Sequence, residues 1–179
     1  MTPEDILNFW FVECAQKDWW QKSSAFDGKI ERRFGEVHQA ATRGELAHWR
    51  ARGRGRLAEV IVLDQFSRNI FRDDPRAFAY DTIALVLAQE AISAGVQTSW
   101  SPTWRSFLYM PFMHSESLPV HEEAIKLFGE PGLEDNLKFE HAHKAIIERF
   151  GRYPHRNSIL GRTSSAEEIA FLKEPGSSF

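Results

Sequence analysis

The stretch LAEVIVLDQFSRNIFR, residues 57–72, decides the fold of this 179-residue chain. Its first half is apolar on nearly every side, which is typical of a helix buried in a protein core. In its second half Asp64 and Arg68 stand four residues apart and continue the helix face that begins at Leu57 and Ile61. A buried charge must be paired or must meet a ligand, because an unpaired one is costly to remove from water. The stretch therefore predicts a buried central helix whose last turns carry charge.

Helical patterns continue on both sides of this stretch. Thr2, Pro3 and Asp5 form a capping-box start for a first helix, which Cys14 closes. Apolar residues at helical spacing predict further helices over 26–41, 75–94 and 119–128. Pro111 is expected to kink or break a short helix that begins at Ser101.

The last third of the chain predicts two more helices. One ends at Gly151 and directs an inward stripe toward the core, formed by Phe139, His143, Ile146 and Phe150. The other is capped by Ser164 together with Glu167. No strand-like alternation of useful length occurs, and short connections between helices make neighbours antiparallel. We therefore expect an all-α fold of antiparallel helical hairpins, packed as a tetratricopeptide-like right-handed bundle or superhelix. It forms a single domain over 1–174, with a C-terminal tail over 175–179.

Composition excludes several classes of protein. The net charge of −3 argues against a general nucleic-acid binder. The single cysteine, Cys14, rules out an internal disulfide and fits a reducing compartment. The N-terminus carries acids where a signal peptide has a basic region, and no apolar run approaches the ~20 residues of a membrane span. We expect a soluble cytoplasmic protein without nucleic-acid or membrane partners, and the oligomeric state stays open.

Three polar clusters are candidates for a site. The first lies on the central helix, the second follows Pro111, and the third occupies an irregular segment near the C-terminus. Arginine outnumbers lysine in the first and third, and its planar fork suits carboxylate or phosphate groups. The candidate ligand-binding residues are Asp64, Gln65, Arg68, Asn69, Arg72, Arg152, Arg156 and Asn157, and the candidate catalytic residues are His114, Glu116, His143 and His155. Each also has a structural interpretation, as an internal ion pair, a helix cap or a hydrogen-bonded core histidine.

Metal binding has one weak signal. Glu45 with His48 and Glu140 with His143 match the Glu-x-x-His spacing of di-metal four-helix bundles. That pattern also needs a carboxylate from each of two further helices, and nothing in the sequence identifies them. We predict no metal site and no cofactor.

Four motifs together resemble a known family. They are FWF (9–11), LDQFSRNIFR (63–72), FLYMPFMHSE (107–116) and RFGRYPHRNSILGR (149–162). With them the chain resembles the bacterial domain-of-unknown-function family 924, over nearly its whole length. This family usually has proline at the position of Ser67 and phenylalanine at that of Tyr153. The resemblance implies a tetratricopeptide-like helical fold and brings no established reaction, substrate or catalytic residue.

Three functions are compatible with these residues. The first is a protein that binds an anionic small molecule or peptide through Arg68, Arg72, Arg152 and Arg156, with Asn69 and Asn157 orienting it. The second is a metal-independent hydrolase or lyase acting on an anionic metabolite. There His114, paired with Glu116 or Asp64, is the general base, and His143 or His155 is the acid. The third is a protein-interaction scaffold, which predicts an exposed apolar groove.

Overall fold

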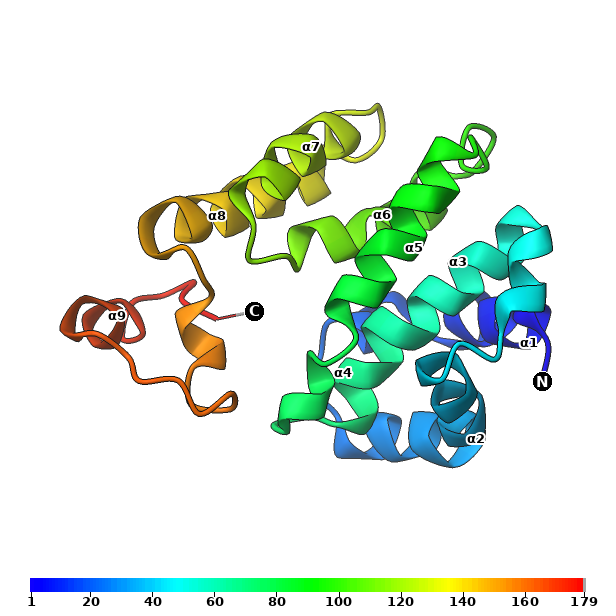
Figure 1. Ribbon diagram of the computed structural model, residues 1–179, viewed down its shortest axis with the longest axis horizontal. Coiled ribbons are helices and arrows are strands. Elements are labelled where there is room, and N and C mark those ends of the chain that lie inside the picture. The colour runs from blue at the N-terminus through cyan, green and yellow to red at the C-terminus, as the bar shows by residue number, and fades with distance from the viewer. Residues whose placement is uncertain (179) are drawn as a thin grey trace.

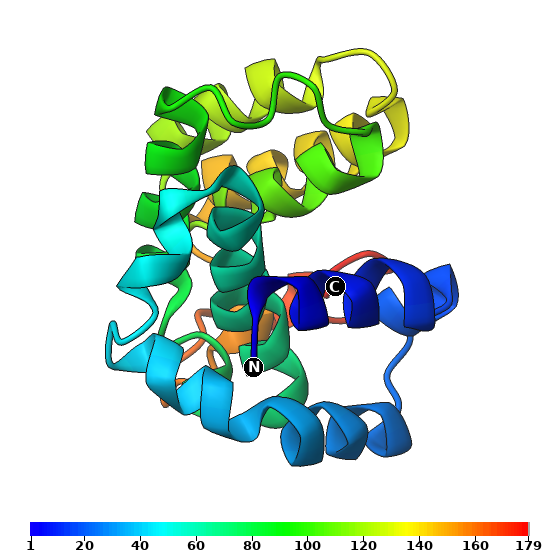
Figure 2. The ribbon, with the colours of Figure 1, turned by 90° about the vertical axis from the view of Figure 1, so that its right-hand side faces the viewer.

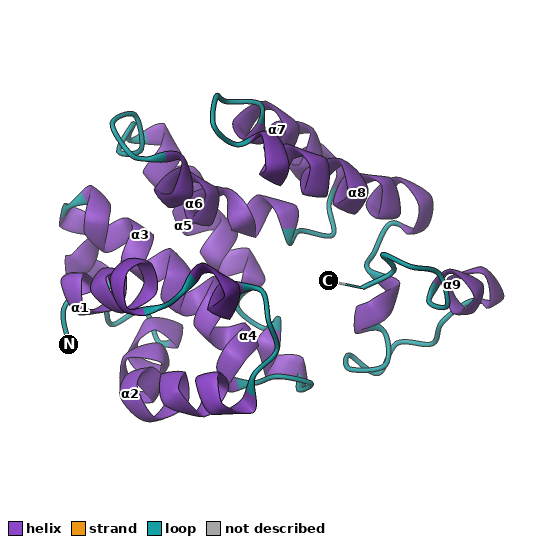
Figure 3. Cartoon of the chain, turned by 180° about the vertical axis from the view of Figure 1, so that it is seen from behind, coloured by secondary structure: helices purple, strands orange, loops and turns teal. Residues whose placement is uncertain are grey.

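The computed structural model describes residues 1–178 and shows an all-helical protein in this range, with no strand (Figures 1 and 3). The helices are α1 (Pro3–Asn8), α2 (Ser24–Thr42), α3 (Gly53–Ile61), α4 (Ser67–Ile70), α5 (Asp81–Ser93), α6 (Pro102–Met113), α7 (Leu118–Phe128), α8 (Glu134–Phe150) and α9 (Ala166–Phe171). Short 3₁₀ or π turns lie between them: η1 (Phe9–Glu13), η2 (Gln16–Trp19), η3 (Ala47–Ala51), η4 (Val62–Phe66), η5 (Pro75–Ala77) and η6 (Pro154–Arg156). Within the described part of the chain, no helix has the length and apolar character needed to cross a bilayer.

The central helix predicted from residues 57–72 is present. It is formed by α3, the π turn η4 and α4, which follow one another without a break in helical backbone conformation. Every residue from Leu57 to Ser67 is buried, as expected for a helix that is apolar all round. The Ser67 hydroxyl donates to the Leu63 carbonyl oxygen at 2.6 Å and lies 2.8 Å from Nε2 of His38. The π turn lies at the change from apolar to charged residues, and such turns are frequent at functional sites.

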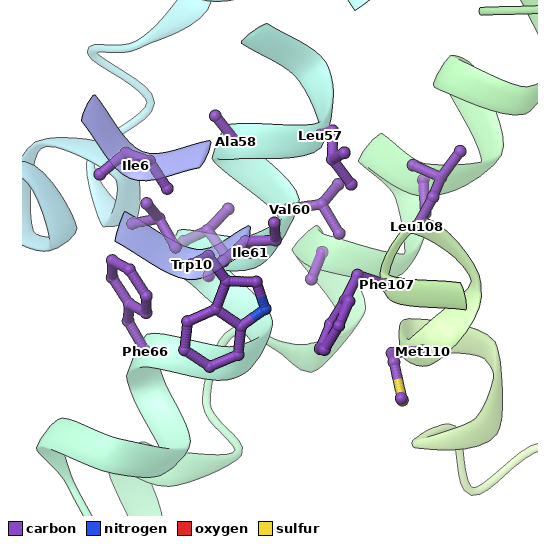
Figure 4. Packing of buried hydrophobic residues seen from close by; sticks show 14 of the residues in the cluster. Ile6, Trp10, Leu57, Ala58, Val60, Ile61, Phe66, Phe107, Leu108 and Met110 are labelled. Atoms are coloured by element: carbon purple, nitrogen blue, oxygen red, sulfur yellow. The ribbon is translucent and has the colours of Figure 1, made fainter. Parts of the chain in front are cut away.

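The main core packs against this helix from three sides (Figure 4). The ring of Trp10 lies 5.6 Å from that of Phe66 and 5.5 Å from that of Phe107, so the turn η1 after α1, the central helix and α6 meet in one aromatic cluster. Burying each such side chain contributes roughly 1.5–3 kcal/mol. Many of the aromatic side chains therefore pack between the N-terminal helices and α6.

The C-terminal third contributes to two clusters. The turn 129–133 joins α7 to α8, and the two helices pack side by side. Phe128 of α7 belongs to the main core, where its ring lies 5.8 Å from that of Tyr109 in α6, whereas the smaller cluster buries Ile146, Ile147 and Tyr153 against Phe150 and Phe171. Figure 1 shows α9 on the side of the molecule opposite α1, and in Figure 2 α2 and α7 lie at opposite ends. Helix α6 contacts both α7 and α8 and also α3, and so links the C-terminal third to the central helix.

The structure corrects several sequence expectations. Helix α6 continues through Pro111 to Met113, because residues Ser106–Met113 are all buried and neighbouring helices hold the chain in place. The pattern over 75–94 forms two elements, η5 and α5, instead of one helix. Phe139 is 60% exposed, and Glu140 takes the inward position.

Of the two helix caps predicted from the sequence, one is confirmed and the other lies one residue further along the chain. The capping box of Thr2 and Asp5 is present at the start of α1. The last helix is capped by Ser165 with Glu168, one residue later than the Ser164 and Glu167 expected from the sequence. Both serines precede an acidic residue at the same spacing, so the pattern alone does not choose between them.

Gly55 provides a test of the packing around α3. A Cβ atom there would lie 2.0 Å from the Trp49 carbonyl oxygen, whereas a Cβ at Gly35 in α2 meets nothing within 4 Å. We expect Gly55→Ala to lower the free energy of unfolding by roughly 1–3 kcal/mol through overpacking. Gly35→Ala is expected to raise it by roughly 0.5–1 kcal/mol through helix propensity. Urea unfolding of both variants measures the difference, and equal effects would contradict the packing described here.

Candidate functional site

The candidate site includes a buried carboxylate and an arginine at the end of the central helix. Asp64 lies in η4 with its side chain 1% exposed, and Arg68 lies one turn later in α4. Arg68 Nη1 donates to Asp64 Oδ1 at 3.1 Å, which confirms the predicted contact between them. The same guanidinium binds Asp81, the first residue of α5, through two hydrogen bonds of 2.8 and 2.9 Å. Arg68 therefore holds the central helix to α5.

His114 joins this network from the end of α6. Its Nδ1 lies 2.7 Å from Asp64 Oδ1, and the Gln65 amide donates to the other carboxylate oxygen at 2.5 Å. Burial alone would raise the pKa of Asp64, but the charge of Arg68 and the contact with His114 hold it well below its usual value. Burial, together with Arg68, lowers the pKa of His114. At neutral pH Asp64 is therefore ionised and accepts the proton on Nδ1 of a neutral imidazole, whose Nε2 then carries a lone pair.

Arg156 enters the network from η6. Its side chain is 8% exposed and lies between the rings of Phe78 and Tyr153, each with its centroid 4.6 Å from the guanidinium carbon. Nη2 donates to the His114 carbonyl oxygen at 3.0 Å, and Nη1 makes a longer contact of 3.3 Å with Asp81. Its buried Nε has no hydrogen-bond partner among residues 1–178. Arg156 is thus less completely satisfied than Arg68.

Part of this network lines a cavity of about 260 Å³. Its charged or imidazole lining residues are Asp81, His114, Glu116 and Arg156, whereas Asp64 and Arg68 do not line it. The apolar part of the wall comes from η5 with the loop after it, from α5, from α6 and from the segment after η6, and consists of Pro75, Phe78, Ala79, Leu85, Pro111 and Leu160. All three polar clusters found in the sequence therefore contribute to one network, but only the second and third reach the cavity, through His114, Glu116 and Arg156.

Glu116 has a different partner from the one expected. Instead of contacting His114, it accepts two hydrogen bonds from Arg162, at 2.7 and 2.9 Å, and one from the Tyr153 backbone N–H at 2.7 Å. Burial alone would raise the pKa of Glu116, but these donors lower it. Asn157 accepts from Arg162 at 2.9 Å and donates to Ser164 at 3.0 Å. Glu116 therefore ties the irregular C-terminal segment to the residues that follow α6.

Other predicted ligand-binding residues lie away from the cavity. Asn69 and Arg72 both donate to Asp27 of α2, at distances between 2.6 and 2.8 Å. Arg152 donates to both carboxylate oxygens of Glu168 in α9, at 2.7 and 2.9 Å. These arginines have carboxylates of the chain itself as partners, and none of the three residues contributes to the cavity wall.

The two remaining candidate histidines do not line the cavity. Nδ1 of His143 in α8 lies 2.7 Å from the Phe139 carbonyl oxygen, and the ring of His155 lies 5.5 Å from that of Tyr153. Burial lowers the pKa of His143 to about 3 and that of His155 to about 4. Both imidazoles are therefore neutral at pH 7 and poor proton donors.

The Glu-x-x-His pairs have partners other than a metal. Glu45 forms an exposed ion pair with Arg43, and Glu140 contacts His121 of α7. Among the residues that the structure describes, no group of three or more His, Cys, Asp or Glu side chains has the arrangement to hold a metal ion.

Sequence reasoning missed Asp81 and His121. Asp81 stands at the start of a helix, where an acidic residue ordinarily serves the helix dipole, so its sequence position carries no separate signal. His121 lies within the pattern of an amphipathic helix, and nothing near it in sequence indicates its buried partner. Both belong to contacts between elements far apart along the chain, which only the fold brings together.

Two comparisons find similar proteins. The model of the family described as "Bacterial protein of unknown function (DUF924)" matches residues 6–176. A solved structure of a protein of unknown function from Agrobacterium tumefaciens, ATU0120, is 38% identical, with a TM-score of 0.91 and 96% of each chain covered. Among curated proteins no sequence matches the chain.

The buried neutral histidines predict how stability depends on pH. Burial lowers the pKa of His38 and of His155 to about 4, and that of His143 to about 3, from 6.5 in the unfolded chain. Between pH 6.5 and 4 the unfolded state binds more protons, so stability falls as pH falls. We expect a loss on the order of 1 kcal/mol per histidine between pH 7 and 5. Urea unfolding at these two pH values checks this, and equal stability at both would contradict the neutral state of the three rings.

Proposed function

The chain belongs to the DUF924 family of bacterial proteins of unknown function, and we propose that it binds a small molecule with an anionic group in the cavity beside Arg156 and His114. The observation that carries this proposal is that polar side chains from α5, from the end of α6 and from η6, distant in sequence, line one cavity. Small-molecule sites are typically concave and largely apolar, with a few converging polar groups. A cavity of about 260 Å³ favours a small molecule over a peptide.

Arg156 is the group that recognises the anion in this proposal. Its pKa is lowered by burial and by the nearby charge of Arg68, so a negative group beside it is favourable. Asp81 compensates the charge of Arg156 only in part, because its carboxylate already accepts two short hydrogen bonds from Arg68. A carboxylate or phosphate in the cavity would lie beside this guanidinium, and charge-assisted hydrogen bonds are stronger than neutral ones.

His114 gives the ligand a second polar contact. Because Asp64 accepts the proton on Nδ1, Nε2 of the neutral ring accepts a hydrogen bond. The apolar wall, with Phe78, Leu85 and Pro111, suits a hydrocarbon portion. The ligand class is therefore a small monoanion that combines an apolar part with a hydrogen-bond donor such as a hydroxyl.

Acid–base catalysis in the same cavity is a second candidate function. The contact between Asp64 and His114 favours it, because a buried carboxylate on Nδ1 orients an imidazole as a general base. The acids considered in the sequence, His143 and His155, lie outside the cavity wall, and their lowered pKa values disfavour proton donation. Water or a substrate group would have to donate the proton.

A scaffold role has less support. The large exposed apolar side chains belong to separate elements, including α5, α8 and α9, and are Met1, Val12, Trp20, Ile83, Val86, Phe139 and Ile169. A docking groove for a partner protein would instead gather such residues on one face.

Arg156→Met tests the proposed ligand site. 3-Hydroxybenzoate and 4-hydroxybenzoate, monoanions that each carry a hydroxyl, serve as probes, and the neutral 3-hydroxybenzamide serves as a matched control ligand. We expect the wild-type protein to bind at least one anionic probe more tightly than 3-hydroxybenzamide, and Arg156→Met to weaken that binding at least about tenfold, as for loss of one charge-assisted contact. Calorimetry and NMR shifts of Thr82 and Leu85 report affinity and place.

Arg76→Met is the control variant for net charge. Arg76 is an exposed arginine paired with Asp74, and it does not line the cavity. The substitution Arg76→Met therefore removes the same charge from the protein without changing a residue of the cavity wall. We expect it to change probe affinity less than about twofold, since surface charges are screened. Equal binding by wild type and Arg156→Met, or shifts confined to other regions, would contradict the proposed function.

A further inference from the structure

Three successive backbone carbonyls around His114 are each held by a side chain. The Tyr153 hydroxyl donates to the Met113 carbonyl oxygen at 2.5 Å, and Arg156 donates to that of His114 at 3.0 Å. His121 Nε2 lies 2.8 Å from the carbonyl oxygen of Ser115. These donors come from α7 and from the segment after α8. The end of α6 is thus fixed at several consecutive peptides, and it is the end that carries His114.

His121, like Tyr153, is a fully buried donor. It is 0% exposed, and its Nδ1 lies 2.6 Å from Oε1 of Glu140, which is also 0% exposed. A carbonyl oxygen only accepts hydrogen bonds, so Nε2 of His121 must carry a proton. The contact on the Nδ1 side needs one further proton, which His121 and Glu140 share.

Glu140 has no other role in view. Its second oxygen, Oε2, is buried without a hydrogen-bond partner among residues 1–178. Leaving such an atom unsatisfied costs free energy, and burial raises the pKa of Glu140. A buried polar atom without a partner often belongs to a group that serves a purpose other than stability. In the described part of the chain, the only hydrogen bond of the Glu140 side chain is the one that orients His121.

We propose that His121 and Glu140 are positioning residues for the site: they fix the Ser115 carbonyl and thereby keep the His114 ring on Asp64, with Nε2 available to the ligand. This inference rests on the proposed function. Glu140 holds Nδ1 of His121, His121 holds the Ser115 peptide, and that peptide follows His114 directly. Hydrogen bonds therefore connect α8 to the residues at the cavity, although neither His121 nor Glu140 lines the cavity wall.

Two substitutions at His121 separate positioning from packing. In His121→Gln the amide nitrogen reaches the place of Nε2 and still donates to Ser115, whereas in His121→Asn the amide reaches only the place of Nδ1. Long-range ¹H–¹⁵N NMR of the histidine rings gives the readout, because it distinguishes a proton on Nδ1 from one on Nε2. In the wild type we expect His114 to carry its proton on Nδ1.

The expected results differ between the two variants. His121→Gln keeps the Nδ1 proton of His114 and a 3-hydroxybenzoate affinity within about threefold of wild type, because the hydrogen bond from the ligand hydroxyl to Nε2 is retained. His121→Asn gives mixed His114 tautomers and at least about fivefold weaker 3-hydroxybenzoate binding, because that hydrogen bond is lost. If His121→Asn does not fold, Glu140→Leu replaces it, because it also releases the His121 ring. An unchanged His114 signature in the folded variant overturns the proposal.

The two readouts separate this inference from the proposed function. If the wild type fails to bind either hydroxybenzoate while His121→Asn still changes the His114 tautomer, the binding function is wrong and the positioning role stands. If 3-hydroxybenzoate binds the wild type and the His114 signature is the same in every folded variant, the positioning role is wrong and the binding function stands.

Discussion

Arg68 places a guanidinium between two carboxylates, Asp64 of its own helical run and Asp81 of α5, in a region with little access to water. Removing such ions from water costs several kcal/mol each, and only close, well-oriented partners offset the cost. Asp64 therefore also receives hydrogen bonds from Gln65 and His114. The requirement to satisfy this one buried carboxylate brings the end of α6 against the central helix.

The same requirement shapes the cavity. Once Arg68 occupies Asp81 with two hydrogen bonds, Arg156 is left with one long contact to that carboxylate and an unpartnered Nε. The aromatic rings of Phe78 and Tyr153 on its two faces hold the guanidinium in place. The site thus has one arginine with a structural role and a second, similar arginine with unused donors. A preorganised, incompletely satisfied cation beside a cavity is a favourable arrangement for anion binding.

Much of the fold follows from residue spacing alone. The mostly apolar residues at 57–63 predict a buried helix because the helical spacing continues through Asp64, Arg68 and Phe71. The pairing of Asp64 with Arg68 follows for the same reason. The boundaries are harder, since Ser164 and Ser165 offer equivalent caps, and Pro111 remains helical because tertiary packing outweighs the loss of one backbone hydrogen bond.

The candidate site is less accessible to sequence reasoning. Arg72, Arg152 and Arg156 have the same chemistry, and the sequence gives them similar weight. Only the fold supplies Asp27 and Glu168 as partners for the first two and leaves Arg156 at the cavity. Asp81 and His121 were missed because their roles depend on contacts across more than ten residues of chain, which local patterns do not contain.

The central claim is that Asp64 and Arg156, which do not touch, belong to one coupled network through Arg68 and Asp81. A double-mutant cycle with Asp64→Asn and Arg156→Met, measured as free energies of unfolding, tests it most directly. The account predicts a coupling energy of at least about 0.5–1 kcal/mol, whereas a control cycle of Asp64→Asn with Arg72→Met should be additive. Additive effects in the first cycle would contradict a single network and leave the three polar segments as independent structural contacts.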